Sequence, residues 1–355
     1  MNTTPLFPTS VIGSMPRPAF VKDLIADGAP YSGAEYRRLM GDAIRYAVAL
    51  QEAAGLDVIT DGEWWRRSYI GVIAELAHGF ELSLNPVDGR PWTIVVDKLS
   101  PKTPGFIANE VKFLKQFTKK PVKATLPAPA LLGERMWDPV RPAKAYPTRE
   151  AFIRDCVPIL RREVELLRDE GVSIIQIDDP HLCLFVDAGV RSQYDDPAKA
   201  SDFAVDMDNS VVDGIPNIRT AVHLCRRAGA RARGEADHQG GYDPILRQLG
   251  RLKVNHVTME FTTPGAGDMS VFKELPEHME VGLGCVSSQP GQIDSPETIV
   301  ARVEMALKYL APARITLNPD CGFAPGSAAV VDIDEVYLKL KNEVEAARRL
   351  REKYA

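Results

Sequence analysis

The sequence lacks the features that mark several large classes of protein. No apolar run approaches the roughly 20 residues that a membrane-spanning helix requires, so we expect no membrane partner. The amino-terminal stretch MNTTPLFPTSVIGS does not show the basic and then apolar pattern of a signal peptide. No basic patch stands out in a chain of formal net charge -5, which argues against a nucleic-acid partner. These absences predict a cytoplasmic protein that acts on small molecules.

Cysteine is also scarce. The chain has 5 cysteines, an odd number without close pairing, at positions 156, 183, 225, 285 and 321. This pattern argues against a disulfide framework, and in a reducing compartment a cysteine serves as a metal ligand, a nucleophile or a small core residue.

The chain lacks the glycine-rich loop of a dinucleotide-binding open sheet, since its first β-type run continues as VIGSMPRP rather than G-x-G-x-x-G. Eight short β-type runs alternate mostly with helical patterns, at residues 10–14, 57–63, 121–129, 173–180, 217–225, 253–261, 279–287 and 314–322. Helical patterns cover residues 33–55, 148–171 and 295–310, among others. This alternation predicts an α/β protein, a single-domain (β/α)8 TIM barrel over residues 1–355. Residues 85–120 fit a βα unit poorly, and we expect an excursion there, such as a hairpin near the barrel mouth.

Acids and metal-binding side chains follow five of the predicted strands. They are Asp61, Glu63, Asp178, Asp179, His223, Cys225, Glu260, Asp320 and Cys321. The carboxyl ends of barrel strands converge on one mouth, where barrel enzymes build their active sites. One such acid alone could simply cap the next helix. Five strand ends of this kind favour a functional site.

The stretch AVHLC places His223 and Cys225 at positions i and i+2 of a strand, so both side chains face the barrel interior. Together they are half of a tetrahedral zinc site, which Glu260 and Cys321 could complete. The alternative is that His223 is a polar core residue and both cysteines are small hydrophobic ones. We assign Cys156, Cys183 and Cys285 to the core; Cys156 lies within a predicted helix.

Taken in order, the motifs VIGSMPRP, QEAAGLDVITDGE, IIQIDDP, HLC, VTMEF, VGLGCV and LNPDCGF resemble the catalytic half of cobalamin-independent methionine synthase. The similarity runs from Val11 to about Gly322 and is to the short, single-barrel relatives. It implies a TIM barrel with a zinc ion held by His223, Cys225, Glu260 and Cys321. It also implies that Ile12, Gly13 and Ser14 bind homocysteine and that Glu63 and Asp178 contact its amino group, as the substrate-binding and catalytic acids.

The positions that handle the methyl donor depart from the family pattern. The stretch TLPAP stands where the long enzyme has a tryptophan that stacks on the pterin. Gln289 stands where that enzyme has a proton-donating histidine, and glutamine cannot act as a general acid. The donor is therefore left open between a folate, a methylcorrinoid and another small molecule. The loop at residues 234–244, which contains His238, is expected to lie near the substrate.

The resemblance implies zinc-dependent methyl transfer to the thiol of homocysteine. The alternative is an epoxyalkane:coenzyme M transferase-type reaction, in which Arg66 and Arg67 would bind the sulfonate. Both arginines could equally be solvated surface charges. The retention of Glu63 and Asp178 favours an amino-acid thiol, because two carboxylates would repel a sulfonate. A third possibility, a structural or zinc-storing barrel, would not need acids at the same mouth.

Overall fold

The computed structural model describes residues 5–26, 28–84, 91–141, 144–226, 238–323 and 331–355. Within them, a parallel sheet runs in chain order through β3 (Lys123–Pro127), β4 (Ile174–Asp178), β5 (Arg219–His223), β6 (His256–Glu260), β7 (Glu280–Val286) and β8 (Ile315–Pro319). A separate antiparallel pair joins β1 (Ala77–Leu84) and β2 (Pro91–Pro101).

The helices alternate with these strands. They are α1 (Ala19–Ile25), α2 (Gly33–Ala54), α3 (Ile73–Leu76), α4 (Phe106–Leu114), α5 (Pro129–Met136), α6 (Arg149–Asp169), α7 (Pro180–Leu184), α8 (Ala188–Arg191), α9 (Pro197–Val212), α11 (Leu246–Leu249), α12 (Pro296–Ala306) and α13 (Ile333–Tyr354). Short 3-10 turns lie at η1 (Asp243–Ile245), η2 (Pro264–Ala266), η3 (Met269–Glu274) and η4 (Pro312–Arg314). In the described residues, no helix is both long and apolar enough to span a membrane.

Two short segments close the sheet into a (β/α)8 barrel. Thr9 forms a β-bridge to Leu317 of β8, and Ser10 forms one to Val58. The residue after Val58, at position 59, forms a β-bridge to Val122, just ahead of β3. The predicted strands at 10–14 and 57–63 therefore occupy the expected places, but they appear as isolated bridges rather than as strands. One cause is that the Thr9 carbonyl accepts hydrogen bonds from two successive N–H groups, at residues 57 and 58, which interrupts a regular ladder.

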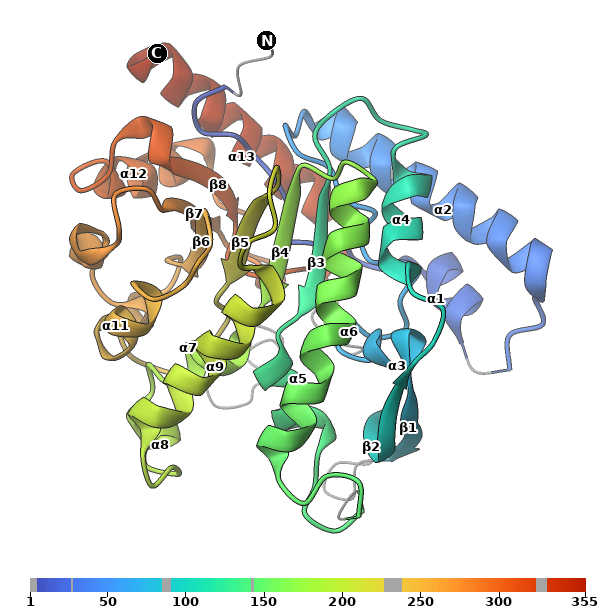
Figure 1. Cartoon of the computed structure of the whole chain (residues 1–355). Helices are drawn as coiled ribbons and strands as arrows, with labels where there is room; N and C mark the ends of the chain where they lie inside the picture. The colour runs from blue at the N-terminus through green and yellow to red at the C-terminus, as the bar shows by residue number, and fades with distance from the viewer. Residues whose placement is uncertain (1–4, 27, 85–90, 142–143, 227–237, 324–330) are drawn as a thin grey trace.

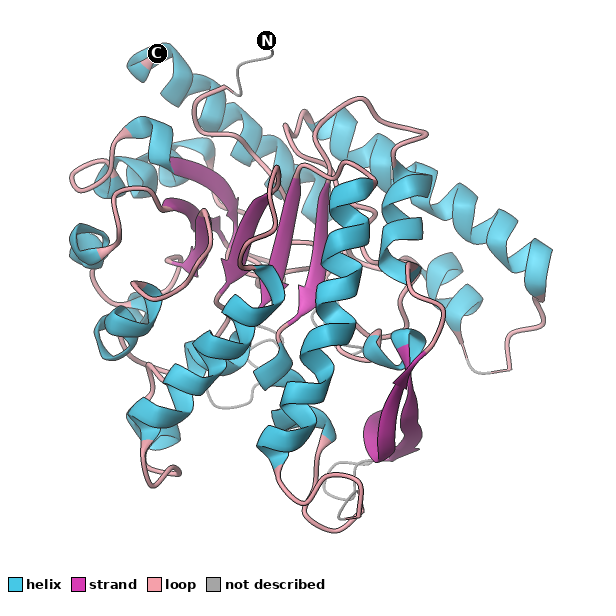
Figure 2. Ribbon diagram, in the orientation of Figure 1, coloured by secondary structure: helices cyan, strands magenta, loops and turns pink. Residues whose placement is uncertain are grey.

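Figure 1 shows helices packed around the outside of the strands, as expected when parallel strands are buried on both faces. Strands β3, β6 and β8 are buried at every residue. The strand arrows in Figure 2 point toward the end of the molecule that carries the hairpin β1–β2. That end is the carboxyl-terminal mouth, and the carboxyl terminus of the chain lies at the other end.

Helix boundaries follow local signals in the sequence. Helix α2 stops at Gly55, whose φ of 97° is the left-handed conformation that glycine adopts without strain. Helix α6 begins where the Thr148 side chain accepts a hydrogen bond from the Ala151 N–H, and the Ser295 side chain caps α12 in the same way. The predicted helices at 33–55, 148–171 and 295–310 correspond to α2, α6 and α12.

The stretch between the second and third strand positions carries the hairpin and α4. The predicted excursion at 85–120 overlaps β2 and α4, while residues 85–90 lie outside the described part of the chain. The buried carboxylate of Glu163 in α6 accepts hydrogen bonds from the Gly105 and Ile107 N–H groups at the start of α4. A carboxylate at a helix amino terminus satisfies N–H groups that have no partner within the helix. This contact fixes α4 against the barrel.

Candidate active site

A histidine and two cysteines meet at the barrel mouth. His223 ends β5, Cys225 follows two residues later and Cys321 follows β8. Their ligand atoms all lie within 4.8 Å of one another, and all three residues are buried. The sulfurs of Cys225 and Cys321 are 3.1 Å apart. Histidine and cysteine are the side chains that a zinc site uses, so the three form a candidate metal centre.

The orientation of His223 is fixed from behind by Asp178. The Nδ1 atom of His223 lies 2.9 Å from Oδ1 of Asp178, its neighbour in the β4–β5 register. Because a carboxylate only accepts hydrogen bonds, Nδ1 carries the proton. The Nε2 atom is buried, and no residue that the structure describes forms a hydrogen bond with it. A metal-binding histidine typically shows this arrangement, with a carboxylate on one nitrogen and the metal on the other.

Asp178 is engaged by a second partner as well. The same Oδ1 accepts a hydrogen bond of 2.7 Å from Nε2 of Gln176, which also donates to the Ile12 carbonyl at 3.2 Å. Burial lowers the pKa of His223, but the hydrogen bond and the charge of Asp178 outweigh burial, and the pKa is raised overall. Asp178 therefore holds the histidine of the candidate metal centre, in addition to the substrate contact that the sequence predicts for it.

Glu260, the fourth predicted ligand, lies at the end of β6 and is 1% exposed. Its Oε1 accepts a hydrogen bond of 2.7 Å from the Arg226 N–H. Among the described residues, the group whose ligand atoms lie within 4.8 Å of one another contains His223, Cys225 and Cys321 but not Glu260. The structure thus brings three of the four predicted ligands together and places the fourth at the end of β6, the strand next to β5 in the sheet.

The backbone around Glu63 is unusual. Glu63 has a φ of 59° and follows Gly62, whose φ is 71°. A left-handed conformation at a residue other than glycine is uncommon and is found preferentially at functional sites. The Asp61 carboxylate accepts a hydrogen bond from the Glu63 N–H at 2.9 Å, and Nη2 of Arg17 donates to the Glu63 carbonyl at 3.0 Å. These contacts hold the turn.

The Glu63 carboxylate is buried at the mouth. Its Oε1 accepts a hydrogen bond of 2.7 Å from the Thr125 hydroxyl, and no hydrogen bond from a described residue reaches its Oε2. Burial raises the pKa of Glu63, while the nearby Arg66 charge lowers it and the Asp178 charge raises it. A buried carboxylate with one oxygen left over is suited to a cationic ligand.

The predicted Ile12–Gly13–Ser14 turn lies between the two groups of side chains. A Cβ added at Gly13 would lie 2.5 Å from Oε1 of Glu63, so only glycine fits beside this carboxylate. A Cβ added at Gly322 would lie 2.3 Å from Oγ of Ser14, which places the Ser14 hydroxyl against the residue that follows Cys321. The turn therefore contacts both sides of the mouth.

The structure corrects the interpretation of Arg66 as a surface or anion-binding residue. Arg66 is buried, and its Nη2 lies 2.7 Å from Oε2 of Glu110 in α4. Its Nη1 donates to the carbonyl and the hydroxyl of Thr125, at 2.9 and 3.1 Å. The guanidinium is therefore committed to internal partners, because the helix that the excursion contributes supplies a carboxylate at this point. Arg67, the second predicted anion-binding residue, is exposed.

Two other strand-end acids have structural roles. Asp320 accepts hydrogen bonds from the Phe261 and Thr262 N–H groups, at 3.1 and 3.2 Å, and so fixes the loop after β6. Asp179 accepts a hydrogen bond of 2.9 Å from the Leu182 N–H and caps α7. Helix capping, the alternative considered for a single strand-end acid, therefore applies to Asp179, and Asp320 shows that the loop backbones after the strands also need acceptors.

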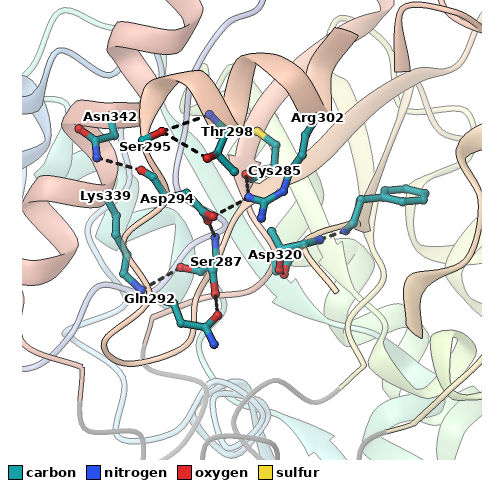
Figure 3. Close-up of polar contacts among 12 residues, drawn as sticks. Cys285, Ser287, Gln292, Asp294, Ser295, Thr298, Arg302, Asp320, Lys339 and Asn342 are labelled. Carbon is teal, nitrogen blue, oxygen red and sulfur yellow. Dashed lines mark hydrogen bonds and ion pairs between the residues drawn. The ribbon is translucent and has the colours of Figure 1, made fainter. Parts of the chain in front are cut away.

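The loop after β7, where Gln289 lies, is held by α13 (Figure 3). The buried Lys339 donates to the carbonyls of Ser287 and Gln289, at 2.9 and 2.6 Å. Asp294 accepts a hydrogen bond from the Ser287 N–H at 2.7 Å and pairs with Arg302 at 2.9 Å. The backbone of Gln289 is therefore fixed close to the end of β7. No local sequence pattern indicated Lys339, which lies 50 residues later.

Residues 227–237, and with them the first part of the loop around His238, lie outside the described residues. His238 itself lies 3.6 Å from Asp187, measured between Nδ1 and Oδ2. The cysteines assigned to the core, at positions 156, 183 and 285, are buried, and burial raises the pKa of each thiol. A raised pKa keeps these thiols protonated and unreactive.

The fold and the cluster together define a TIM barrel whose carboxyl-terminal mouth carries a candidate metal centre. The chain belongs to the family described as "Cobalamin-independent synthase, Catalytic domain", whose sequence profile matches residues 7–349.

Individual relatives agree with this assignment. The chain is 27% identical to a methionine synthase of Pyrococcus horikoshii over 356 residues, which covers 98% of this chain and 94% of the relative. It is 28% identical to a 5-methyltetrahydropteroyltriglutamate–homocysteine methyltransferase of Serratia proteamaculans, of which it covers 44%. The fold resembles a B12-independent methionine synthase from Shewanella sp. W3-18-1 in complex with selenomethionine, with a TM-score of 0.80, 22% identity and 98% of each chain covered.

Proposed function

We propose that this protein transfers a methyl group to the thiol of homocysteine and forms methionine, with a zinc ion held by His223, Cys225, Cys321 and Glu260. The observation that carries the proposal is the buried, unpartnered Nε2 of His223 beside two cysteine sulfurs. A buried polar atom without a partner costs free energy unless a ligand completes it. Two thiols and an imidazole nitrogen suit zinc better than a hard cation such as Mg2+.

Bound at this centre, zinc would deprotonate a coordinating thiol and so provide a thiolate, which is the nucleophilic form. Asp178 would keep Nε2 of His223 free of a proton by holding that proton on Nδ1. Glu260 is the candidate fourth ligand that would give way to the substrate sulfur, because its carboxylate already has a competing partner in the Arg226 N–H.

The remaining residues would bind the amino-acid part of the thiol. Glu63, with Oε2 not engaged by the described residues, would accept hydrogen bonds from the substrate ammonium group, together with Asp178. Gly13 and Ser14 would hold the substrate through the turn that contacts both sides of the mouth. Orientation of this kind aligns the sulfur with the methyl carbon that it attacks.

The names of two relatives support the substrate, since one is a methionine synthase and the other is named for the transfer of methyl from 5-methyltetrahydropteroyltriglutamate to homocysteine. The donor for this chain, a folate or a methylcorrinoid, is left open. Gln289 can hydrogen-bond a donor but cannot protonate it. A donor whose leaving group needs no proton is compatible with this residue.

The alternative reaction, opening of an epoxide by coenzyme M, depends on anion-binding residues near Glu63. The commitment of the Arg66 guanidinium to Glu110 and Thr125 weighs against this alternative. The buried carboxylates of Glu63 and Asp178 would repel a sulfonate at the same place.

The test is an assay on purified protein whose metal content has been measured. Homocysteine is combined with methyltetrahydrofolate, with methylcobalamin, or with neither, and methionine is measured by mass spectrometry; a parallel reaction contains coenzyme M and an epoxide. We expect one zinc per chain and methionine with at least one donor. Product from coenzyme M alone, or a metal-free protein that is fully active, would overturn the proposal.

A further inference from the structure

A continuous chain of buried polar contacts leads from α4 to the barrel mouth. Glu110 in α4 pairs with Arg66, Arg66 donates to the Thr125 hydroxyl at 3.1 Å, and that hydroxyl donates to Glu63 at 2.7 Å. All four residues are buried, with exposed fractions of 7% or less. The chain joins a helix outside the barrel to one of the predicted substrate-binding acids.

The direction of each hydrogen bond follows from the chemistry of the groups. An arginine side chain only donates, so the Thr125 hydroxyl must accept from Arg66. The single hydroxyl proton of Thr125 is then directed to Glu63, the other neighbour of the oxygen. A donor aimed at a carboxylate stabilises the ionised form, and this effect opposes the burial that disfavours the charge of Glu63.

The place of Thr125 on β3 does not by itself require a hydroxyl. Its methyl group packs against Gly13, where an added Cβ would lie 2.8 Å from Cγ2. Valine has the same shape and is favoured in buried strands. A buried hydroxyl costs free energy unless both of its hydrogen bonds are made. The polar group at this position therefore serves its two partners rather than the packing of the strand.

We propose that Thr125, oriented by the buried Arg66–Glu110 pair, is a positioning residue that keeps Glu63 ionised and in one orientation for the ammonium group of the thiol substrate. This inference rests on the proposed function. It gives the predicted excursion a role at the site, because Glu110 reaches the mouth through Arg66. It also assigns Arg66 a role that does not involve contact with the substrate.

The test compares two thiols by titration calorimetry with the zinc-loaded protein. Homocysteine carries the ammonium group, and 4-sulfanylbutanoate is the same molecule without it. Thr125→Val removes the hydroxyl at nearly constant volume, and Thr125→Ser restores it. Thr220→Val is the matched control, because Thr220 is a buried threonine of β5 that lies at the opposite end of the barrel and contacts Asn255.

We expect Thr125→Val to weaken homocysteine binding by about 10-fold or more, the range for a hydrogen bond to a charged group. Thr125→Ser should recover most of this loss, and Thr220→Val should bind as the wild type does. The affinity for 4-sulfanylbutanoate and the zinc content should change by less than about 2-fold in every variant. This selectivity for the ammonium group is not expected of a residue that only maintains the fold.

Equal weakening for both thiols would overturn the inference and show that Thr125 acts through packing. Unchanged homocysteine binding in Thr125→Val would overturn it as well, while leaving the proposed function intact. If the wild-type protein binds 4-sulfanylbutanoate as tightly as homocysteine, the substrate assignment itself fails, and the role of Glu63 fails with it. The wild-type titrations therefore separate failure of the function from failure of the inference.

Discussion

The two sides of the barrel mouth differ in how far their buried polar groups are paired within the chain. On the side of β5 and β8, His223 presents a buried nitrogen without a partner to two cysteine sulfurs. On the side of β3, Arg66 forms an ion pair with Glu110 and two hydrogen bonds with Thr125. One side presents a histidine nitrogen that no described residue hydrogen-bonds, and the other is an internally paired network.

The difference indicates where an outside ligand is needed. Pairing within the chain offsets the desolvation of Arg66 and Glu110, so this side is stable as it stands. The cysteine and histidine side lacks such pairing at Nε2 of His223, and a metal ion would supply it. Glu63 shares features of both sides. Its Oε1 accepts a hydrogen bond from Thr125 of the paired network, whereas no described residue hydrogen-bonds to its Oε2, where the proposed substrate would bind.

The largest effect is expected from Cys321→Ser, on the side of β5 and β8. Loss of one thiolate ligand should lower zinc affinity by at least about 100-fold and abolish methyl transfer. Metal analysis after dialysis against a weak chelator measures the first effect. Cys285→Ser is the control, because Cys285 is buried in β7 but lies outside the cluster, and this variant should keep its zinc. Full zinc retention in Cys321→Ser would refute the assignment.

The paired side should respond in stability rather than in metal content. Arg66→Met leaves the Glu110 carboxylate buried without its cation, which should lower the free energy of unfolding by about 3–5 kcal/mol. Urea unfolding of the metal-free protein is the measurement. Arg45→Met, which removes the partner of the exposed Asp42, should cost less than about 1 kcal/mol. An equal loss of unfolding free energy in the two variants would mean that the buried Arg66–Glu110 pair stabilises the protein no more than the exposed pair does.

Sequence reasoning was most successful where local patterns decide the structure. The alternation of β-type and helical runs predicted the barrel, and the i, i+2 spacing of His223 and Cys225 predicted that their side chains would lie together. The rule that strand ends converge then brought Cys321 to the same place across 96 residues. Each of these inferences depends only on strand periodicity and on barrel topology.

The same reasoning failed where a partner is chosen by packing. Arg66 could equally have been a solvated surface charge, yet it pairs with Glu110, which is 44 residues away in the excursion. Thr125 lies 62 residues from Glu63, and the stretch TLPAP that it begins gave no indication of this contact. The sequence also gave no indication of which strand-end acids would accept hydrogen bonds from backbone N–H groups, as Asp320 does. Such pairings depend on the three-dimensional register of loops, which no local spacing encodes.

Asp178→Asn tests metal binding and substrate binding together, because Asp178 contacts His223 and is also one of the predicted substrate-binding acids. If Asp178 only contacts the amino group of homocysteine, as the sequence resemblance implies, this variant should weaken homocysteine binding and keep its zinc. The hydrogen bond from Nδ1 of His223 to Asp178 changes this expectation, and zinc affinity should fall about 10- to 100-fold as well. Chelator competition measures the zinc affinity. Glu63→Gln is the control and should weaken homocysteine binding while leaving zinc affinity unchanged. The same zinc affinity in both variants would mean that Asp178 does not support the metal ligand.

The smallest effect concerns a pair of acids just behind the mouth. Asp179, which caps α7, and Asp208 of α9 are both fully buried, and among the described residues Oδ2 of Asp179 and both carboxyl oxygens of Asp208 have no hydrogen-bond partner. Burial raises the pKa of Asp179 to about 6 from an ordinary value of 3.8, and burial and the Asp179 charge raise the pKa of Asp208. An acid whose pKa is raised by folding stabilises the protein most when it is protonated. This contribution is complete below the unfolded pKa, near 3.8, and is lost as the pH rises through the folded pKa, about 6 for Asp179.

Asp208→Asn replaces the acid whose pKa burial and the Asp179 charge raise, so position 208 stays neutral at every pH. Relative to the wild type, its free energy of unfolding should therefore rise between pH 5 and pH 8, on the order of 1 kcal/mol. Urea unfolding at the two pH values measures this change, and Asp195→Asn, at an exposed acid just before α9, is the control. A stability difference between Asp208→Asn and the wild type that stays constant with pH would contradict the raised pKa of Asp208. A rise confined to Asp208→Asn would show that the buried position of Asp208 in α9, close to Asp179 at the end of β4, favours its protonated form.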